Sequence, residues 1–147
     1  MKLSDIAKIK INAEMDTAID ANHLDDEASK LPQLHNKYLC MLMDEKVYLE
    51  TLESKMNILN RDKWLYYSGK MSEEELSKKG WEPFELNILK NDLDRFIDSD
   101  GDIIDLRNQI FIQKEKINYI ESVAKIISNK IWNIRSMIEW IKFTQGV

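Results

Sequence analysis

The chain has 147 residues and a mass of 17.4 kDa, with 21 Lys and Arg against 26 Asp and Glu, so its formal charge is -5. That length holds about one domain and excludes a large multidomain enzyme. Four Gly and two Pro are too few for an all-β sandwich or a glycine-looped nucleotide-binding fold. The composition therefore predicts an all-α protein, and its negative charge means that any anionic partner needs a local basic patch.

The N-terminal third is acidic and loosely patterned, and we expect only short helices over residues 1–31. Pro32 then favours a helix start, because its fixed backbone angle suits the first turn and its missing N–H is not needed there. Apolar residues after it recur at spacings of three and four, which is typical of an amphipathic helix. This pattern predicts a long helix over about 33–66.

Two turn signals divide the middle of the chain into shorter helices. Ser72, with Glu75 three residues later, has the pattern of a capping box, and Gly80 ends the short helix that this box begins. Pro83 favours the start of a further helix, which we expect to stop at an acidic turn. The carboxylates of that turn lack the register of an EF-hand, so we interpret it as a polar turn in which Asp102 caps the next helix.

The last predicted element is the longest and the most regular. Residues 103–144 contain no Gly and no Pro, so they can form one continuous helix. Its isoleucines repeat every seven residues, with a second set three residues later, and Ile at both a and d positions favours more than two strands in a coiled coil. A neighbouring apolar stripe gives the helix a second seam, which favours closure into a ring or barrel of parallel helices. The residues assigned to self-association are Ile117, Ile120, Ile127, Ile131, Ile134, Ile138 and Ile141.

A second use of the same stripe stays open, because a broad apolar face can also pack on the chain's own first long helix.

The charges separate two regions, since residues 1–107 carry a net charge of -8 and residues 108–147 one of +3. We divide the chain into an N-terminal helical region, 1–102, and a C-terminal oligomerisation helix, 103–147. The expected fold is an elongated all-α protomer that assembles through this last helix into an oligomeric ring.

One run, NRDKWLYYSGK, combines the side chains that single-stranded nucleic acid requires. Phosphates attract Arg and Lys, and unpaired bases stack on aromatic faces for about 1–3 kcal/mol each without regard to sequence. The N-terminal region is therefore predicted to bind single-stranded DNA over about 55–70, although the same aromatic residues would also suit a core beside a solvated basic face. The candidate contact residues are Arg61, Lys63, Trp64, Tyr66, Tyr67 and Lys70.

No pattern in the sequence favours catalysis or a metal site. His23 and His35 are isolated among polar residues, and no glycine loop could hold a phosphate. We therefore expect no enzymatic activity, no catalytic residues, no metal and no cofactor. No apolar stretch has the length of a membrane span, and a single cysteine suits a reducing compartment, so we expect a cytoplasmic protein without membrane contact.

Several segments, in one order and spacing, carry a resemblance to a known family. They are the opening MKLSDI, the residues Asp20, Leu24, Glu27 and Ala28, the run RDKWLYYSGK, the segments PFELNILKNDLD and QKEKINYIES, and the C-terminal IEWIKFTQG. Together they are similar to the UvsY family, the recombination mediators of tailed bacteriophages.

The resemblance implies a function, partners and site residues. Proteins of this family are not enzymes. They bind single-stranded DNA coated by the phage single-strand-binding protein, loosen that coat and help the phage RecA-like recombinase to nucleate, in homologous recombination and in recombination-dependent replication and repair. Their DNA-contacting basic pair corresponds to Arg61 and Lys63, with the residue types exchanged, and they form rings of six or seven subunits. The resemblance places the protein in the cytoplasm of the infected bacterial host. An alternative hypothesis for the function is a structural coiled-coil or phage assembly chaperone that does not bind DNA.

Overall fold

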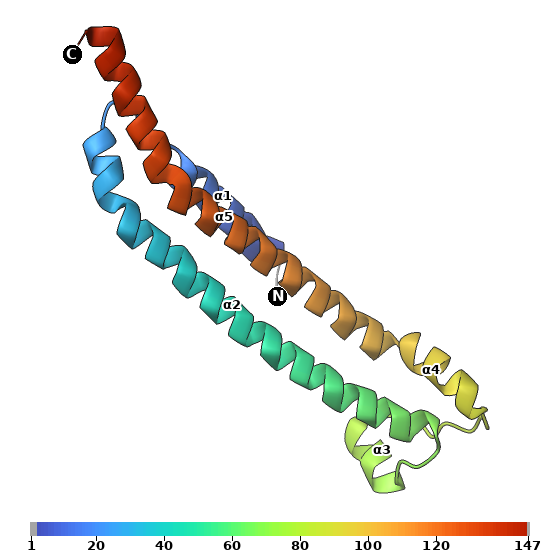
Figure 1. The fold of residues 1–147 in the computed structure, drawn as a ribbon. Helices are drawn as coiled ribbons and strands as arrows, with labels where there is room; N and C mark the ends of the chain where they lie inside the picture. The colour runs from blue at the N-terminus through green and yellow to red at the C-terminus, as the bar shows by residue number, and fades with distance from the viewer. Residues whose placement is uncertain (1–2, 147) are drawn as a thin grey trace. The chain divides into compact units, whose positions relative to one another are not determined.

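The computed structural model describes residues 3–146, and in this part of the chain it contains five α-helices and no strand (Figure 1). The predicted all-α class is confirmed, and so is the long C-terminal helix. None of these helices is both long and apolar enough to cross a membrane. In chain order they are α1 (Leu3–Thr17), α2 (Leu24–Tyr67), α3 (Glu73–Lys79), α4 (Lys90–Asp98) and α5 (Gly101–Gln145).

The first long helix, α2, begins earlier than the sequence predicts. It starts at Leu24, so Pro32 lies inside the helix and the predicted start at residue 33 was wrong. A proline there removes one backbone hydrogen bond. The early turns persist because they carry tertiary contacts: Leu31 is buried, and the carboxylate of Glu27 lies 2.7 Å from the ammonium of Lys130. Packing on α5 therefore decides where α2 begins.

The short helix α3 follows the predicted signals closely. The side chain of Ser72 accepts a hydrogen bond from the backbone N–H of Glu75 at 3.2 Å, which makes it the N-cap. Gly80 ends the helix with a left-handed backbone angle, φ 68°, that side chains other than glycine rarely adopt. Local chemistry alone thus positions this helix.

The helix predicted to start at Pro83 is shorter than expected. α4 begins only at Lys90, and the preceding residues 81–89 form no regular helix. The physical reason is that Phe84 packs against aromatic rings of other elements, with its ring centroid 4.9 Å from that of Tyr67 and 5.8 Å from that of Phe96. This anchoring holds the segment in an irregular conformation that the local sequence does not indicate.

The described residues form two compact units, and each contains a part of both long helices. The first unit consists of residues 3–47 and 113–146, and the second of residues 48–112. These units differ from the predicted division at residue 102, which followed the helices along the chain. The candidate DNA-binding run lies wholly in the second unit.

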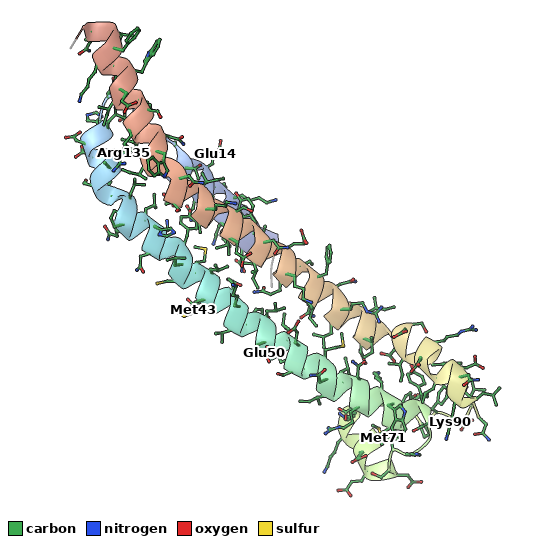
Figure 2. All side chains as sticks on the ribbon, in the orientation of Figure 1. Glu14, Met43, Glu50, Met71, Lys90 and Arg135 are labelled. Carbon is green, nitrogen blue, oxygen red and sulfur yellow. The ribbon has the colours of Figure 1, made fainter. Side chains whose placement is uncertain are left out.

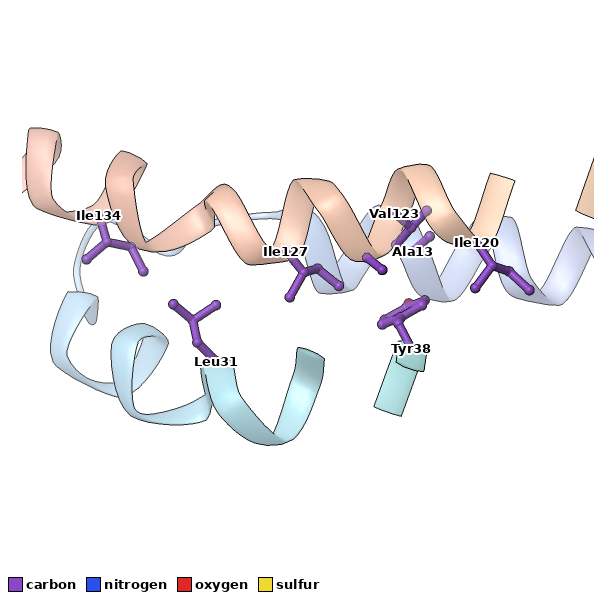
Figure 3. Packing of buried hydrophobic residues seen from close by; sticks show 8 residues of the cluster. Ala13, Leu31, Tyr38, Ile120, Val123, Ile127 and Ile134 are labelled. Atoms are coloured by element: carbon purple, nitrogen blue, oxygen red, sulfur yellow. The ribbon is translucent and has the colours of Figure 1, made fainter. Parts of the chain in front are cut away.

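The core of the first unit lies where α2 and α5 run side by side, with α1 packed along them (Figure 3). Ion pairs join Glu27 to Lys130 and Glu45 to Lys116. Residue numbers therefore decrease along α5 in the direction in which they increase along α2. The two helices are therefore antiparallel in this unit. The buried members of the core come from all three helices: Ala13, Leu31, Tyr38, Ile120, Val123, Ala124, Ile127 and Ile134.

Candidate nucleic-acid interface

The basic aromatic run over residues 61–70 forms the C-terminal end of α2 and the turn that follows it. Because an α-helix turns by about 100° per residue, neighbouring residues of the run face different ways. One face is covered by other residues of the second unit, and the other face is exposed to solvent. The covered residues are Asp62, Lys63, Tyr66 and Tyr67, and the outward residues are Arg61, Trp64 and Lys70.

The outward face carries an exposed indole and two exposed cations. Trp64 is 40% exposed, and the ammonium nitrogen of Lys70 lies 4.6 Å from its ring centroid. Arg61, three residues before Trp64, keeps 68% of its side chain exposed although one guanidinium nitrogen lies 3.2 Å from Asp62. Gly69 allows this arrangement, because its left-handed φ of 74° ends the helix and turns the chain back toward it. We call Arg61, Trp64 and Lys70 the outward patch.

Lys63, by contrast, is enclosed, with only 5% of its side chain exposed. Its Nζ lies 2.8 Å from Asp102, 3.1 Å from Asp100 and 3.9 Å from the ring centroid of Trp81. Removing one partner of a buried ion pair costs about 3–5 kcal/mol of folding free energy. One phosphate contact contributes about 0.7 to the slope of log K against log salt, which corresponds to about 1 kcal/mol of binding free energy near 0.1 M salt. Contact of Lys63 with DNA stays a prediction, and it would require both ion pairs to break.

Asp100 connects this charged cluster to the start of α5. One of its carboxylate oxygens accepts a hydrogen bond from the hydroxyl of Tyr67 at 2.6 Å, and the other accepts from the backbone N–H groups of Asp102 at 2.9 Å and Ile103 at 3.3 Å. Asp100 is therefore the cap of α5, and the expectation that Asp102 caps it was wrong. Burial alone would raise the pKa of Asp100, but the hydrogen bonds from Tyr67 and Lys63 outweigh it and hold that pKa below its ordinary value.

The two tyrosines of the run belong to an aromatic cluster that holds the end of α2 in place. The ring of Tyr66 lies edge-on to Trp81 at 5.3 Å, and the ring of Tyr67 lies edge-on to Phe84 at 4.9 Å and tilted against Phe96 at 5.8 Å. Such pairs contribute about 0.5–1.5 kcal/mol each beyond the area that they bury. These contacts cover much of both tyrosines, and stacking of DNA bases on them stays a prediction.

The isoleucines assigned to self-association lie mostly inside the first unit. Ile131 packs against its core, Ile138 is 37% exposed, and Ile141 is half-buried. Packing within the chain, the alternative that the heptad pattern left open, therefore accounts for most of the stripe. The four members that are at most 6% exposed are Ile117, Ile120, Ile127 and Ile134.

The last turns of α5 expose a different apolar surface. Trp140 is 65% exposed and Phe143 is 78% exposed, and their ring centroids lie 6.0 Å apart. Trp140 also borders a hollow of about 350 Å³ with Met137, Ile141 and Ala21. An exposed apolar surface with several aromatic members is typical of a site that contacts another protein.

A family model described as the recombination, repair and ssDNA binding protein UvsY matches residues 12–147. The chain belongs to the UvsY family. Three crystal forms of the bacteriophage T4 recombination mediator protein UvsY have the same fold, with TM-scores of 0.79, 0.83 and 0.78 at 19%, 15% and 18% identity. The alignments cover 99%, 97% and 93% of this chain and 99%, 99% and 98% of those chains. No curated protein sequence matches the chain. The resemblance found in the sequence is confirmed.

Three residues that organise the site of this UvsY-family chain were outside the predicted set. They are Trp81, Asp100 and Lys79, whose ammonium lies 2.8 Å from Asp62. One signal in the sequence could have indicated them: a buried acidic residue such as Asp62 within a basic run needs a cation of its own. A tryptophan in a polar connector likewise needs a covering partner.

Electrostatics restrict where DNA could meet this UvsY-family chain. The second unit carries nine Lys and Arg against fourteen Asp and Glu, a net charge of -5 for residues 48–112. Attraction of a polyanion therefore cannot come from the total charge of the unit. It must come from the nearest cations, because charges beyond about 8 Å are largely screened at physiological salt. Within the run, the exposed cations are Arg61 and Lys70.

Proposed function

We propose that the chain is a recombination mediator that binds single-stranded DNA, loosens the bound single-strand-binding protein and promotes loading of the phage RecA-like recombinase. Membership of a family of recombination, repair and ssDNA binding proteins supports the general role. The T4 protein with the same fold is a recombination mediator, which supports the specific one. We place this activity in the cytoplasm of the infected host and assign the chain no catalytic step.

The outward patch is the observation that carries the DNA-binding part of the proposal. A single strand offers phosphates and unstacked bases, and the patch offers an exposed indole with one cation 4.6 Å from its ring centroid and a second, exposed cation one helical turn earlier. Of the six predicted contact residues, Arg61, Trp64 and Lys70 are exposed, which supports their contact with a strand that approaches from solvent. They are the residues that we assign to direct contact.

Self-association completes the mechanism, and we propose a homo-oligomeric ring of six or seven subunits built on the C-terminal helix. Within the predicted set, Ile141 lines the same hollow as Trp140, and Ile138 is 37% exposed in the preceding turn, so we assign this end of α5 to contact with a second copy. A ring repeats the outward patch, so that a strand captured by one subunit meets the others at high effective concentration. Such avidity gains about two to four decades in affinity. Wrapping the strand would also bend it away from the path of its protein coat.

A pair of tryptophan variants tests the DNA-binding proposal. Trp64→Ala removes the stacking face, and loss of one base stack of about 1–3 kcal/mol weakens binding roughly 5- to 150-fold. Trp132→Ala is the matched control, because Trp132 is 61% exposed and carries Arg135, labelled in Figure 2, 5.1 Å from its ring centroid. The measurement is fluorescence anisotropy with labelled oligo-dT, with light scattering to show that both variants assemble as the parent protein does.

The expected result is a loss of affinity for Trp64→Ala and parent-like affinity for Trp132→Ala. Equal, undiminished binding by both variants would contradict the assignment of the patch. A parent protein that fails to bind oligo-dT even at low salt would favour the alternative, a structural coiled-coil or assembly chaperone without DNA binding.

A further inference from the structure

The ammonium of Lys63 is already surrounded by groups of the protein. It carries three N–H groups, and two carboxylates and an indole face occupy its surroundings at 2.8, 3.1 and 3.9 Å. Asp102 is 57% exposed while Lys63 is 5% exposed, so a phosphate approaching from solvent meets a carboxylate before it meets the ammonium. Repulsion between these two anions opposes the contact.

The same contacts join three separate segments of the second unit. Lys63 belongs to α2, Trp81 to the connector after α3, and Asp100 to the turn before α5. Asp100 is itself bound by Tyr67 from the next turn of α2. The ammonium of Lys63 therefore joins the last turns of α2 to two partners that are distant in the sequence, in addition to the aromatic contacts of Tyr66 and Tyr67.

The outward patch depends on those last turns. Lys70 lies over Trp64 only because the helix continues to Tyr67 and then reverses at Gly69. If the end of α2 frayed, the cation and the ring would separate, and the stacking face would lose its fixed orientation. We infer that Lys63 contacts no phosphate and is a positioning residue, which fastens the end of α2 so that the indole of Trp64 keeps its orientation for stacking on a base of single-stranded DNA. This inference rests on the proposed function.

The salt dependence of oligo-dT binding separates a positioning role from a phosphate contact. Each phosphate contact contributes about 0.7 to the slope of log K against log salt for a single strand. We expect Arg61→Ala to lower that slope by about 0.7 for each engaged subunit. Lys63→Met keeps the length of the side chain without its charge, and we expect it to weaken binding at an unchanged slope. A slope that falls as it does for Arg61→Ala would overturn the inference, and so would unchanged affinity.

A double-variant cycle adds a readout that general destabilisation does not reproduce. If Lys63 acts by placing Trp64, the loss in Lys63→Met is already contained in Trp64→Ala, and the double variant binds as weakly as Trp64→Ala alone. If Lys63 contacts phosphate independently, the two fold-changes multiply. Multiplying losses would therefore count against the positioning role.

A variant at an acidic partner of Lys63 keeps the test valid even if Lys63→Met does not fold. Asp102→Asn retains the lysine and removes one of its two carboxylate partners, and a phosphate-binding Lys63 would then be freed to bind DNA more tightly at a steeper slope. Asp105→Asn, also exposed on α5, is the control for loss of one negative charge. We expect Asp102→Asn to gain no more affinity than Asp105→Asn, and a larger gain would overturn the inference.

The outcomes also distinguish this inference from the proposed function. If Trp64→Ala and Arg61→Ala both bind as the parent protein does, the proposed DNA-binding surface is wrong. If both lose affinity and Lys63→Met lowers the slope to the same extent as Arg61→Ala, the surface stands and only the positioning role fails.

Discussion

Replacement of Ile127 by alanine should unfold the first unit far more easily than the same change at the neighbouring Ile126. Ile127 is 1% exposed within the core of α1, α2 and α5, while Ile126 is 50% exposed. The change deletes three methyl or methylene groups, worth about 2.4 kcal/mol at about 0.8 kcal/mol each. The cavity left at Ile127 adds to this, and the measured range for such changes is about 2–5 kcal/mol. We expect a loss of about 3–4 kcal/mol for Ile127→Ala and about 1 kcal/mol for Ile126→Ala.

The assay is urea unfolding followed by circular dichroism at two protein concentrations. An assembled protein gains stability with concentration by mass action, whereas contacts within one chain contribute equally at every concentration. The gain in helix propensity from Ile to Ala is the same for both variants and cancels in the comparison. The expected difference between the two variants is therefore about 2–3 kcal/mol at both concentrations.

A loss below about 1 kcal/mol for Ile127→Ala, or one confined to low protein concentration, would refute the assignment of the stripe to the core of a single chain. Ile127→Asp combined with Ile134→Asp would place two carboxylates in a closed core, so it should unfold the subunit rather than dissolve a folded ring.

Three further predictions follow from local features. Pro32→Ala restores the backbone hydrogen bond that proline removes within α2 and should stabilise the protein by about 1–3 kcal/mol in thermal melts, and a lower melting temperature would count against the helix at that position. Gly80→Ala should cost about 1 kcal/mol in urea melts from its left-handed backbone alone, because no atom lies within 4 Å of the added methyl, and no loss would mean that α3 ends differently. Burial opposes ionisation of Asp16 and Asp100, but hydrogen bonds from lysine and tyrosine outweigh it and lower both pKa values. The two ionised carboxylates therefore contribute fully to stability above the ordinary aspartate pKa near 3.9, and this contribution is lost as the pH falls through their lower pKa values in the folded state. Asp100→Asn should make the free energy of unfolding, measured in urea melts, fall less steeply between pH 5 and 2.

Features set by neighbouring residues could be predicted from the sequence. The cap and glycine of α3 and the uninterrupted length of α5 depend on residues within a few positions of each other. The start of α2 and the late start of α4 depend on partners elsewhere in the chain. Leu31 packs on α5, and Phe84 packs on Tyr67, so local proline signals at both places were overridden.

The candidate site was predicted in composition but not in orientation. The run of basic and aromatic residues is visible in the sequence, yet the division into covered and outward faces depends on Asp100 and Trp81, which are distant along the chain. The heptads of α5 have the same limit. A stripe of isoleucines requires a covering helix, but its period is the same whether that helix belongs to the same chain or to another copy.

The salt dependence of oligo-dT binding by Arg61→Ala combined with Lys70→Ala tests the central claim most directly. Both cations of the outward patch are then absent, while Lys63 and the covered face are untouched. Lys10→Ala, exposed on α1 in the first unit, is the control for loss of positive charge. With assembly intact by light scattering, we predict weaker binding and a slope lower by about 1.4 for each engaged subunit, against a parent-like control. Parent-like affinity and slope in the double variant would contradict the claim that this patch binds single-stranded DNA.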